Sequence, residues 1–294
     1  MHTGRLAATS SPPAPRPDPP MPITATPEHA AACEKAARAG GRVLREWVGR
    51  FSVSQKGPRD LVTEADHAAQ REIRGLLREA FPDYGFIGEE DDGGGPRPAS
   101  GHAGHSGTGV RWIVDPLDGT SNYVHGFPAY CVSVALADAD DLLVGTIYDP
   151  IRDECFSARR GAGASLDGRP VRVATATDPG DAIAAVSFPP RVTPDAPAVA
   201  DFLAVLPHLH SVRRTGSTAL NLAWLACGRL HAFWVRRIAC WDVAAGMLLV
   251  REAGGVVGPF VAGTPCGETP PLDDPALIAA CTPDLLTSLR GMLR

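Results

Sequence analysis

The stretch "RWIVDPLDGTSNY", residues 111–123, places two acids at the end of an apolar run. The run predicts a buried strand that ends at Asp115, and Asp118 follows three residues later. Pro116 keeps the chain extended and out of a helix, so the two carboxylates can converge across a short loop. Hard carboxylate oxygens in a loop suit Mg²⁺, whereas a solvated acidic turn is the simpler interpretation.

The two residues after Asp118 favour the metal interpretation. Gly119 permits a close approach of the backbone, and Thr120 can open a helix whose free N–H groups face the same place. Asp-Pro and Asp-Gly pairs are common in ordinary turns, so neither pair alone is informative. Their combination in D-P-L-D-G-T indicates a binding site.

Three further acids occur at the ends of predicted elements. Glu89 follows the short apolar strand "GFIG", as Asp115 follows its own strand. Asp242 begins a helix of small residues, where an N-cap aspartate is the alternative interpretation. Asp66 stands three residues after Thr63, and this spacing is also typical of a capping box. Glu89 belongs to the acidic run "GEEDD", which can equally be solvated surface, so each of these acids has a structural explanation as well as a functional one.

Composition limits the class of protein. The 294 residues suit one large domain or two packed subdomains, and 44% hydrophobic residues allow a sizeable core. A net charge of −5 argues against broad binding to nucleic acid or to an anionic membrane. No apolar run approaches the roughly 18 residues that a membrane span needs. The seven cysteines occur singly, without C-x-x-C, which predicts reduced, mostly buried thiols in a cytoplasmic protein.

The pattern along the chain predicts a tail and two subdomains. Residues 1–27 are rich in Pro, Ser and Thr and predict a disordered tail. Residues 28–165 predict an α+β subdomain that carries most of the acids and contains a Gly-rich surface insert at 91–109. Residues 166–294 alternate strands and helices and predict an α/β subdomain with Asp242.

The expected elements follow from apolar periodicity and turn residues. Helices are expected near 28–48, 63–81, 195–206, 217–227, 241–253 and 283–293. Strands are expected near 84–88, 111–115, 131–137, 142–148, 154–158, 183–188, 211–214, 230–235, 255–258 and 277–281. A hairpin is expected with Asp167 and Gly168 at its turn.

Several of these segments together resemble a known family. The segments are "GEE" at 88–90, "DPLDGTSNY" at 115–123 and "WDVAAG" at 241–246, with "KGPRDLVTEAD" at 56–66 and "RRTGSTALNLAWLACGRLHAFW" at 213–234. They resemble the signature of the inositol monophosphatase family, within the Mg²⁺-dependent, lithium-sensitive sugar phosphatases. The resemblance covers about residues 28–290. It implies a layered α/β/α/β/α sandwich of the inositol monophosphatase and fructose-1,6-bisphosphatase type, and a homodimer.

The resemblance also implies roles for single residues. Two or three Mg²⁺ ions would be held by Glu89, Asp115, Asp118, Asp242 and the Leu117 carbonyl. Asp66 and Thr120 would orient the attacking water, with Glu90 as a further acid of the catalytic group. The substrate-side residues would be Gly119, Thr120, Arg213, Gly216, Ser217 and Thr218. The implied enzyme is a phosphomonoesterase that releases phosphate from a small metabolite and is inhibited by Li⁺.

The identity of the substrate is less well defined than the reaction. Inositol monophosphate is the first expectation, but Val235 stands where the family commonly has a glutamate that contacts inositol hydroxyls. A valine cannot accept a hydrogen bond, and Arg236 and Arg237 add positive charge nearby. Val235 can equally be an ordinary strand residue. Histidinol phosphate, fructose 1,6-bisphosphate and 3′-phosphoadenosine 5′-phosphate are therefore kept as alternatives.

A non-catalytic interpretation remains beside the enzymatic one. Pairs of arginines occur at 159/160, 213/214 and 236/237, and they allow a regulatory protein of the same fold that associates with RNA or with transcription. All the matched metal ligands are present, however, whereas a degenerate enzyme usually loses them. The sequence therefore favours the enzyme.

Overall fold

The computed structural model describes residues 23–57, 60–90, 109–139, 141–189, 191–260, 270–273 and 275–293. The first 22 residues of the predicted tail, and the predicted insert up to residue 108, lie outside the described residues. The predicted tail, residues 1–27, is too long at its end, because residues 23–27 are packed against the rest of the chain. Ala25 is buried, the Ile23 N–H donates to Asp138 at 2.9 Å, and Thr26 caps the first helix.

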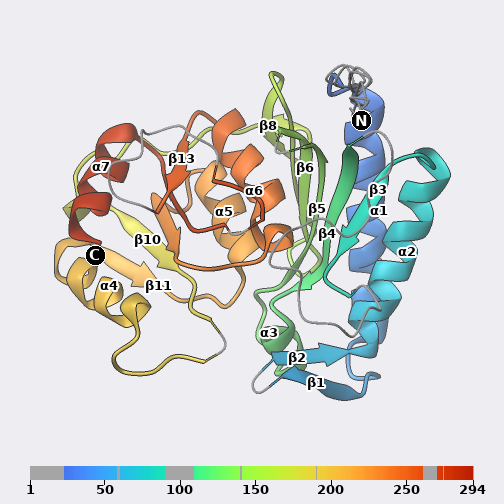
Figure 1. Cartoon of the computed structure of the whole chain (residues 1–294), viewed down its shortest axis with the longest axis horizontal. Coiled ribbons are helices and arrows are strands. Elements are labelled where there is room, and N and C mark those ends of the chain that lie inside the picture. Colours follow the sequence, from blue (N-terminus) through green and yellow to red (C-terminus); the bar gives the residue numbers. More distant parts are fainter. Residues whose placement is uncertain are drawn as a thin grey trace, which may run out of the picture.

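A seven-stranded sheet forms the first half of the molecule (Figure 1). Its strands, in spatial order, are β3 (Gly85–Gly88), β4 (Val110–Asp118), β5 (Cys131–Asp138), β6 (Asp141–Asp149), β7 (Glu154–Arg159), β8 (Gly163–Leu166) and β9 (Arg169–Pro170). Only β3 and β4 pair in parallel, and the other neighbours are antiparallel. β4 runs three residues beyond the predicted end at 115, because pairing with β5 resumes at Asp118 after an irregularity.

Two helices, α1 (Pro27–Trp47) and α2 (Glu64–Ala80), cover the outer face of this sheet. Thr26 and Pro27 start α1 as N-cap and first helical residue. In α2 the buried side chains of Ala69, Ile73 and Leu77 recur at helical spacing and face the sheet. The predictions of both helices are confirmed to within one or two residues.

In its described residues, the second half contains a five-stranded sheet and four α-helices. Its strands, in spatial order, are β11 (Ser211–Arg213), β10 (Ile183–Val186), β12 (Ala232–Val235), β14 (Leu277–Ala280) and β13 (Val256–Pro259). Helices α5 (Thr218–Ala226) and α6 (Cys240–Glu252) lie between the two sheets, and α4 (Pro197–Val205) and α7 (Pro283–Met292) cover the far face. The layers are therefore α/β/α/β/α, which confirms the predicted fold class.

Close packing of α6 on the first sheet brings the two halves together. A Cβ atom added at Gly145 of β6 would lie 2.8 Å from the Ala245 Cα, so only glycine fits there. A Cβ added at Gly246 would lie 2.5 Å from the Leu222 side chain of α5. Because α6 is in contact with both sheets, nearly all its side chains are buried, and its start is held beside the end of β4.

Smaller elements show where the sequence pattern was less informative. The strands β1 (Val53–Gly57) and β2 (Asp60–Thr63) form an antiparallel hairpin that was not predicted. The predicted turn at Asp167 and Gly168 is confirmed, with positive φ angles of 48° and 75°. Since β9 still belongs to the first sheet, the predicted boundary between residues 165 and 166 falls inside this hairpin.

Two sequence-based expectations concern membranes and thiols. None of the helices in the described part of the chain combines the length and apolar character needed to cross a bilayer. Six of the seven cysteines are described, none of these six is in a disulfide, and five of them are buried. Cys266 lies outside the described residues.

Candidate metal centre

Asp115 lies at the end of the parallel pair β3–β4 and is buried. Its Oδ1 accepts a hydrogen bond from the Leu117 N–H at 2.9 Å, which turns the chain after the strand. Its Oδ2 is also buried and has no hydrogen-bond partner among the described residues. A carboxylate oxygen without a partner in the interior is costly, so this atom marks a place where a ligand is expected.

Asp118 is buried and is held by the start of α5. Its Oδ2 accepts hydrogen bonds from the Ser217 hydroxyl at 2.6 Å and from the Ala219 N–H at 2.7 Å. The Cys131 Sγ lies 3.8 Å from the same oxygen. These three contacts all involve Oδ2, so Oδ1 is the oxygen that can bind a further ligand.

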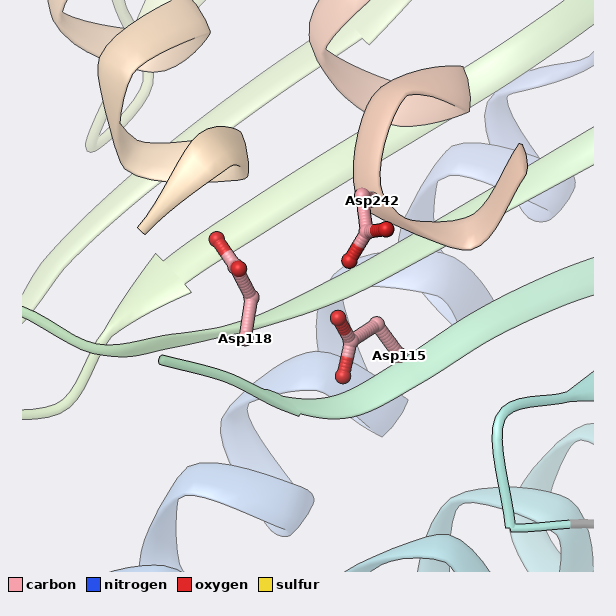
Figure 2. A group of neighbouring side chains, drawn as sticks. All are labelled: Asp115, Asp118 and Asp242. Carbon is pink, nitrogen blue, oxygen red and sulfur yellow. The ribbon is translucent and has the colours of Figure 1, made fainter. Parts of the chain in front are cut away.

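Asp242 belongs to the first turn of α6 and completes a group of three acids. Its Oδ2 accepts from the Ala239 N–H at 3.2 Å, so Asp242 caps the helix from the third helical position, whereas the N-cap is Ala239 and not Asp242 as the alternative interpretation expected. One oxygen from each of Asp115, Asp118 and Asp242 lies within 4.8 Å of the other two. Figure 2 shows Asp242 and Asp115 facing each other from α6 and β4, with Asp118 beside them.

The electrostatics of the three acids oppose their ionisation. Burial raises the pKa of Asp115 well above its ordinary value, and the charges of Glu89, Asp242 and Asp118 add to this effect. Burial, followed by the charges of Asp118 and Glu89, raises the pKa of Asp242 to about 8. Burial also raises the pKa of Asp118 to about 6, although the hydrogen bonds from Ser217 and Ala219 act in the opposite direction. A bound cation would remove the repulsion that these shifts express.

The two glutamates that follow β3 lie next to this group. The Glu89 N–H donates to the Val114 carbonyl at 3.1 Å, which continues the parallel pairing and places Glu89 beside Asp115. Its charge raises the pKa of all three aspartates. Glu90 is buried, its N–H donates to the Gln70 side chain at 2.9 Å, and its carboxylate lies 4.0 Å from the His67 Nδ1.

Asp66 and Thr120 are brought together from distant segments. One oxygen of Asp66 accepts from the Thr63 N–H at 2.9 Å and from the Thr63 hydroxyl at 2.5 Å, so the predicted capping box is present. The other oxygen lies 3.3 Å from the Thr120 hydroxyl, which is also 3.1 Å from the Leu117 carbonyl oxygen. The structural and functional interpretations of Asp66 are therefore compatible.

The predicted substrate-side residues have different surroundings. Gly119 precedes the short helix α3 (Thr120–Val124) with a φ of 96° and is partly exposed. Arg213 is exposed and its guanidinium turns back to the Ser211 hydroxyl of its own strand. Thr218 is buried, and its hydroxyl lies 2.8 Å from the Ser187 hydroxyl.

Ser217, expected on the substrate side, contacts a predicted metal ligand. Its hydroxyl is fully buried, donates to Asp118 and accepts from the Leu220 N–H as the cap of α5. The side chain therefore supports Asp118, and its contact with a substrate stays a prediction. Ser217 precedes an apolar helix and so could be predicted as a cap, but no local signal points to an aspartate 99 residues away.

The donor set fits magnesium. The group offers carboxylate oxygens, one of them without a hydrogen-bond partner, and the resemblance adds the Leu117 carbonyl, and these are the hard ligands that Mg²⁺ takes. Neither an imidazole nor a thiol belongs to the group of three acids. The residues therefore fit the metal that the sequence implied.

Comparison with known proteins agrees with this geometry. Residues 25–281 match the model of the inositol monophosphatase family. The chain belongs to the inositol monophosphatase family. The predicted fold and the prediction of a phosphatase of this family are thereby confirmed.

Named relatives of the family cover most of the chain. It is 42% identical to the Nus factor SuhB of Xylella fastidiosa over 244 residues, which are 82% of this chain and 83% of the relative. It is 40% identical to an inositol-1-monophosphatase of Rhizobium meliloti over 221 residues, 74% of this chain and 80% of the relative. The crystal structure of the extragenic suppressor protein suhB from Bartonella henselae superimposes with a TM-score of 0.80 at 34% identity, covering 90% of this chain and 97% of that one.

Proposed function

We propose that this protein is a Mg²⁺-dependent phosphomonoesterase that hydrolyses inositol monophosphate or a similar small phosphorylated metabolite. The observation that carries the proposal is the group of three carboxylates within 4.8 Å, one of them with an unpartnered buried oxygen. Glu89, Asp115, Asp118, Asp242 and the Leu117 carbonyl would hold two or three ions. When bound, the ions would neutralise the phosphate and polarise the bond that breaks.

The Asp66–Thr120 pair is suited to orienting the attacking water. The Thr120 hydroxyl has one proton, which it donates to Asp66 or to the Leu117 carbonyl. The lone pairs of the Thr120 oxygen can then accept a hydrogen bond from a water molecule. A water that donates in this way points its own lone pairs away from Thr120, in the orientation needed for attack. Buried Asp66 is fixed by Thr63, so it can hold Thr120 in this orientation. Glu90 would support Glu89 from the adjacent position.

The substrate proposal rests on the family and on one relative. The Rhizobium meliloti relative is named inositol-1-monophosphatase, which supports inositol monophosphate as the first candidate. Val235 is buried in the core between the sheets, so it contributes no polar contact. Arg236 is engaged by the buried Asp201, with one hydrogen bond of 2.9 Å, and lies over the Phe260 ring. Of the two arginines after Val235, only Arg237 is exposed.

The decisive experiment is a phosphate-release assay with Mg²⁺. The substrates are inositol 1-phosphate, histidinol phosphate, fructose 1,6-bisphosphate and 3′-phosphoadenosine 5′-phosphate. We expect the highest kcat/KM with inositol 1-phosphate, and Li⁺ should inhibit by competing for one Mg²⁺ position. Asp149→Asn is a matched control, because Asp149 is a buried aspartate of the same sheet outside the group of three acids. Folded protein that releases phosphate from none of the four substrates would contradict the proposal.

We also propose a cytoplasmic homodimer. Phe127 and Ile151 are 53% and 46% exposed, on neighbouring turns joined by a hydrogen bond of 3.2 Å from Arg152 to the Pro128 carbonyl. A contiguous exposed apolar patch marks an interaction surface, and we place the centre of such a patch at these two side chains. Light scattering should give twice the mass of one chain, and Phe127→Asp should reduce it. A monomeric wild-type protein at micromolar concentration would argue against the dimer.

A second candidate function is favoured by one comparison. The Xylella fastidiosa relative carries the name Nus factor SuhB, which fits a protein associated with RNA or transcription. An RNA gel shift at low salt tests direct binding, because contacts with phosphates weaken as salt rises. The net charge of −5 leads us to expect no shift.

A further inference from the structure

The two halves of the molecule meet at Asp118. This aspartate belongs to the end of β4 in the first half, whereas Ser217 and the Ala219 N–H, which bind its Oδ2, belong to the start of α5 in the second half. The direction of the remaining oxygen therefore depends on where the start of α5 lies. Whatever fixes that start also fixes a predicted metal ligand.

Asn122, in the short helix α3, joins the same two halves four residues after Asp118 in the chain. Its Nδ2 donates to the Ala129 carbonyl at 2.6 Å and to the Thr215 carbonyl at 2.9 Å. Ala129 lies in the loop that follows α3, and Thr215 stands two residues before Ser217. Both N–H groups of the amide are thus used, one to hold the loop after α3 and the other to hold the second half.

The loop before α5 is shaped around this amide. Gly216 has a φ of 86°, and a Cβ atom there would lie 2.8 Å from the Asn122 Nδ2 and 2.9 Å from its Oδ1. The Thr215 hydroxyl donates to the Asn221 side chain at 2.8 Å, which ties the loop to the first turns of α5. The position of Asn122 is therefore transmitted through Thr215 to Ser217.

We propose that Asn122 is a positioning residue for the metal centre. It holds the Thr215–Ser217 loop at the distance at which Ser217 binds Asp118, and so orients Asp118 toward Asp115 and Asp242. This inference rests on the proposed function for the identity of the metal. Without the amide, the start of α5 can move away from the end of β4, and the three carboxylates no longer have one fixed spacing.

The test measures Mg²⁺ binding rather than activity. Calorimetric titration of the full chain with MgCl₂, and with MnCl₂ followed by electron paramagnetic resonance, gives the affinity directly. Asn122→Ala should weaken binding by about tenfold, as is usual when a group that orients a metal ligand is lost. Asn122→Asp keeps the volume but presents oxygens to two carbonyls, so it should weaken binding at least as much. Ser217→Ala should weaken Mg²⁺ binding in the same way. Ser217→Thr keeps the hydroxyl and should bind Mg²⁺ with an affinity close to that of the wild type.

Arg229→Ala is the matched control. Arg229 also joins the two halves, through two hydrogen bonds of 2.6 Å to Glu154, but it lies beyond the other end of α5. We expect its Mg²⁺ affinity to equal that of the wild type, although its stability should fall.

The possible results separate the interpretations. Wild-type affinity in both Asn122 variants would overturn the inference, as would an equal loss in Arg229→Ala, since any contact between the halves would then have the same effect. If Asn122→Ala does not fold, as judged by circular dichroism, Asn122→Asp and the Ser217 pair decide the question. A wild-type protein that binds neither cation would overturn the proposed function and this inference with it.

Discussion

Raising the pH should destabilise the metal-free protein and increase its stabilisation by Mg²⁺. Burial, with the charges of Asp118 and Glu89, raises the pKa of Asp242 from 3.8 to about 8. Between these values the folded protein holds a proton that the unfolded chain has released, so the free energy of unfolding falls as pH rises. One such proton corresponds to about 1.4 kcal/mol per pH unit. Since this slope decreases near pH 8, the free energy of unfolding should fall by about 2 kcal/mol in total between pH 6.5 and 8.

Other titrating groups do not obscure the effect of Asp242 between pH 6.5 and 8. The pKa of Asp118, about 6, lies below this window, and the raised pKa of Asp115 acts in the same direction as that of Asp242. Burial lowers the pKa of His29 from 6.5, so the unfolded chain binds this proton more readily than the folded protein does. The free energy of unfolding therefore falls through His29 only as the pH drops below about 6.5, outside this window. Mg²⁺ replaces the protons, so its effect should be larger at pH 8 than at pH 6.5.

Thermal unfolding in a chelator and in MgCl₂ measures both effects. At about 2–4 °C per kcal/mol, the metal-free melting temperature should fall by about 4–8 °C from pH 6.5 to 8. Asp242→Asn cannot bind the proton, so its slope should be smaller than that of the wild type, leaving the part that Asp115 contributes. A melting temperature that is independent of pH, a slope unchanged in Asp242→Asn, or an equal shift by Mg²⁺ at both pH values would refute the reasoning.

Three substitutions test other parts of the site. Asp118→Asn should lower kcat by about a hundredfold or more while circular dichroism stays native, since it weakens the carboxylate group at the metal centre; an active Asn variant would contradict the role. Thr120→Val removes the hydroxyl next to Asp66 and should lower kcat by about a hundredfold with little change in KM, and Thr120→Ser should retain activity; equal loss in both variants would argue against water orientation. Arg236→Ala removes the cation that pairs with the buried Asp201 and should lower the free energy of unfolding in urea by about 2–3 kcal/mol. The expected loss is smaller than for a fully buried pair because Arg236 is partly exposed. A changed substrate preference at unchanged stability would place Arg236 in the substrate site instead.

Local patterns predicted the parts of the site that lie within one segment. Asp115 and Asp118 stand three residues apart at the end of β4, so an apolar run followed by D-P-L-D-G-T predicted that both would lie at the same place, although the strand extends to Asp118 where a loop was expected. Asp242 and Glu89 each stand at the end of an element, but local sequence alone also allowed a cap or a solvated acid. Their placement beside Asp115 came from the family resemblance and is in accord with the structure.

Contacts between the halves could not be predicted, because they depend on packing. The Ser217 hydroxyl reaches Asp118 only once α5 is placed between the two sheets, and the Asn122 amide reaches Thr215 in the same way. The β1–β2 hairpin was missed because its polar residues lack the apolar alternation that marks a strand. Val235 shows the converse case: the sequence identified a departure from the family, and the structure shows that its side chain is core.

The placement of the acids on a strand of the first sheet and on the later helix α6 also has a consequence for biosynthesis. A ribosome completes the strand bearing Asp115 and Asp118 well before it adds Asp242, and chains tend to fold from the amino end as they emerge. A nascent or truncated polypeptide thus carries two crowded acids without the third. If Asp242 is a metal ligand as proposed, we expect phosphatase activity only once α6 has been added, and none from fragments that lack this helix.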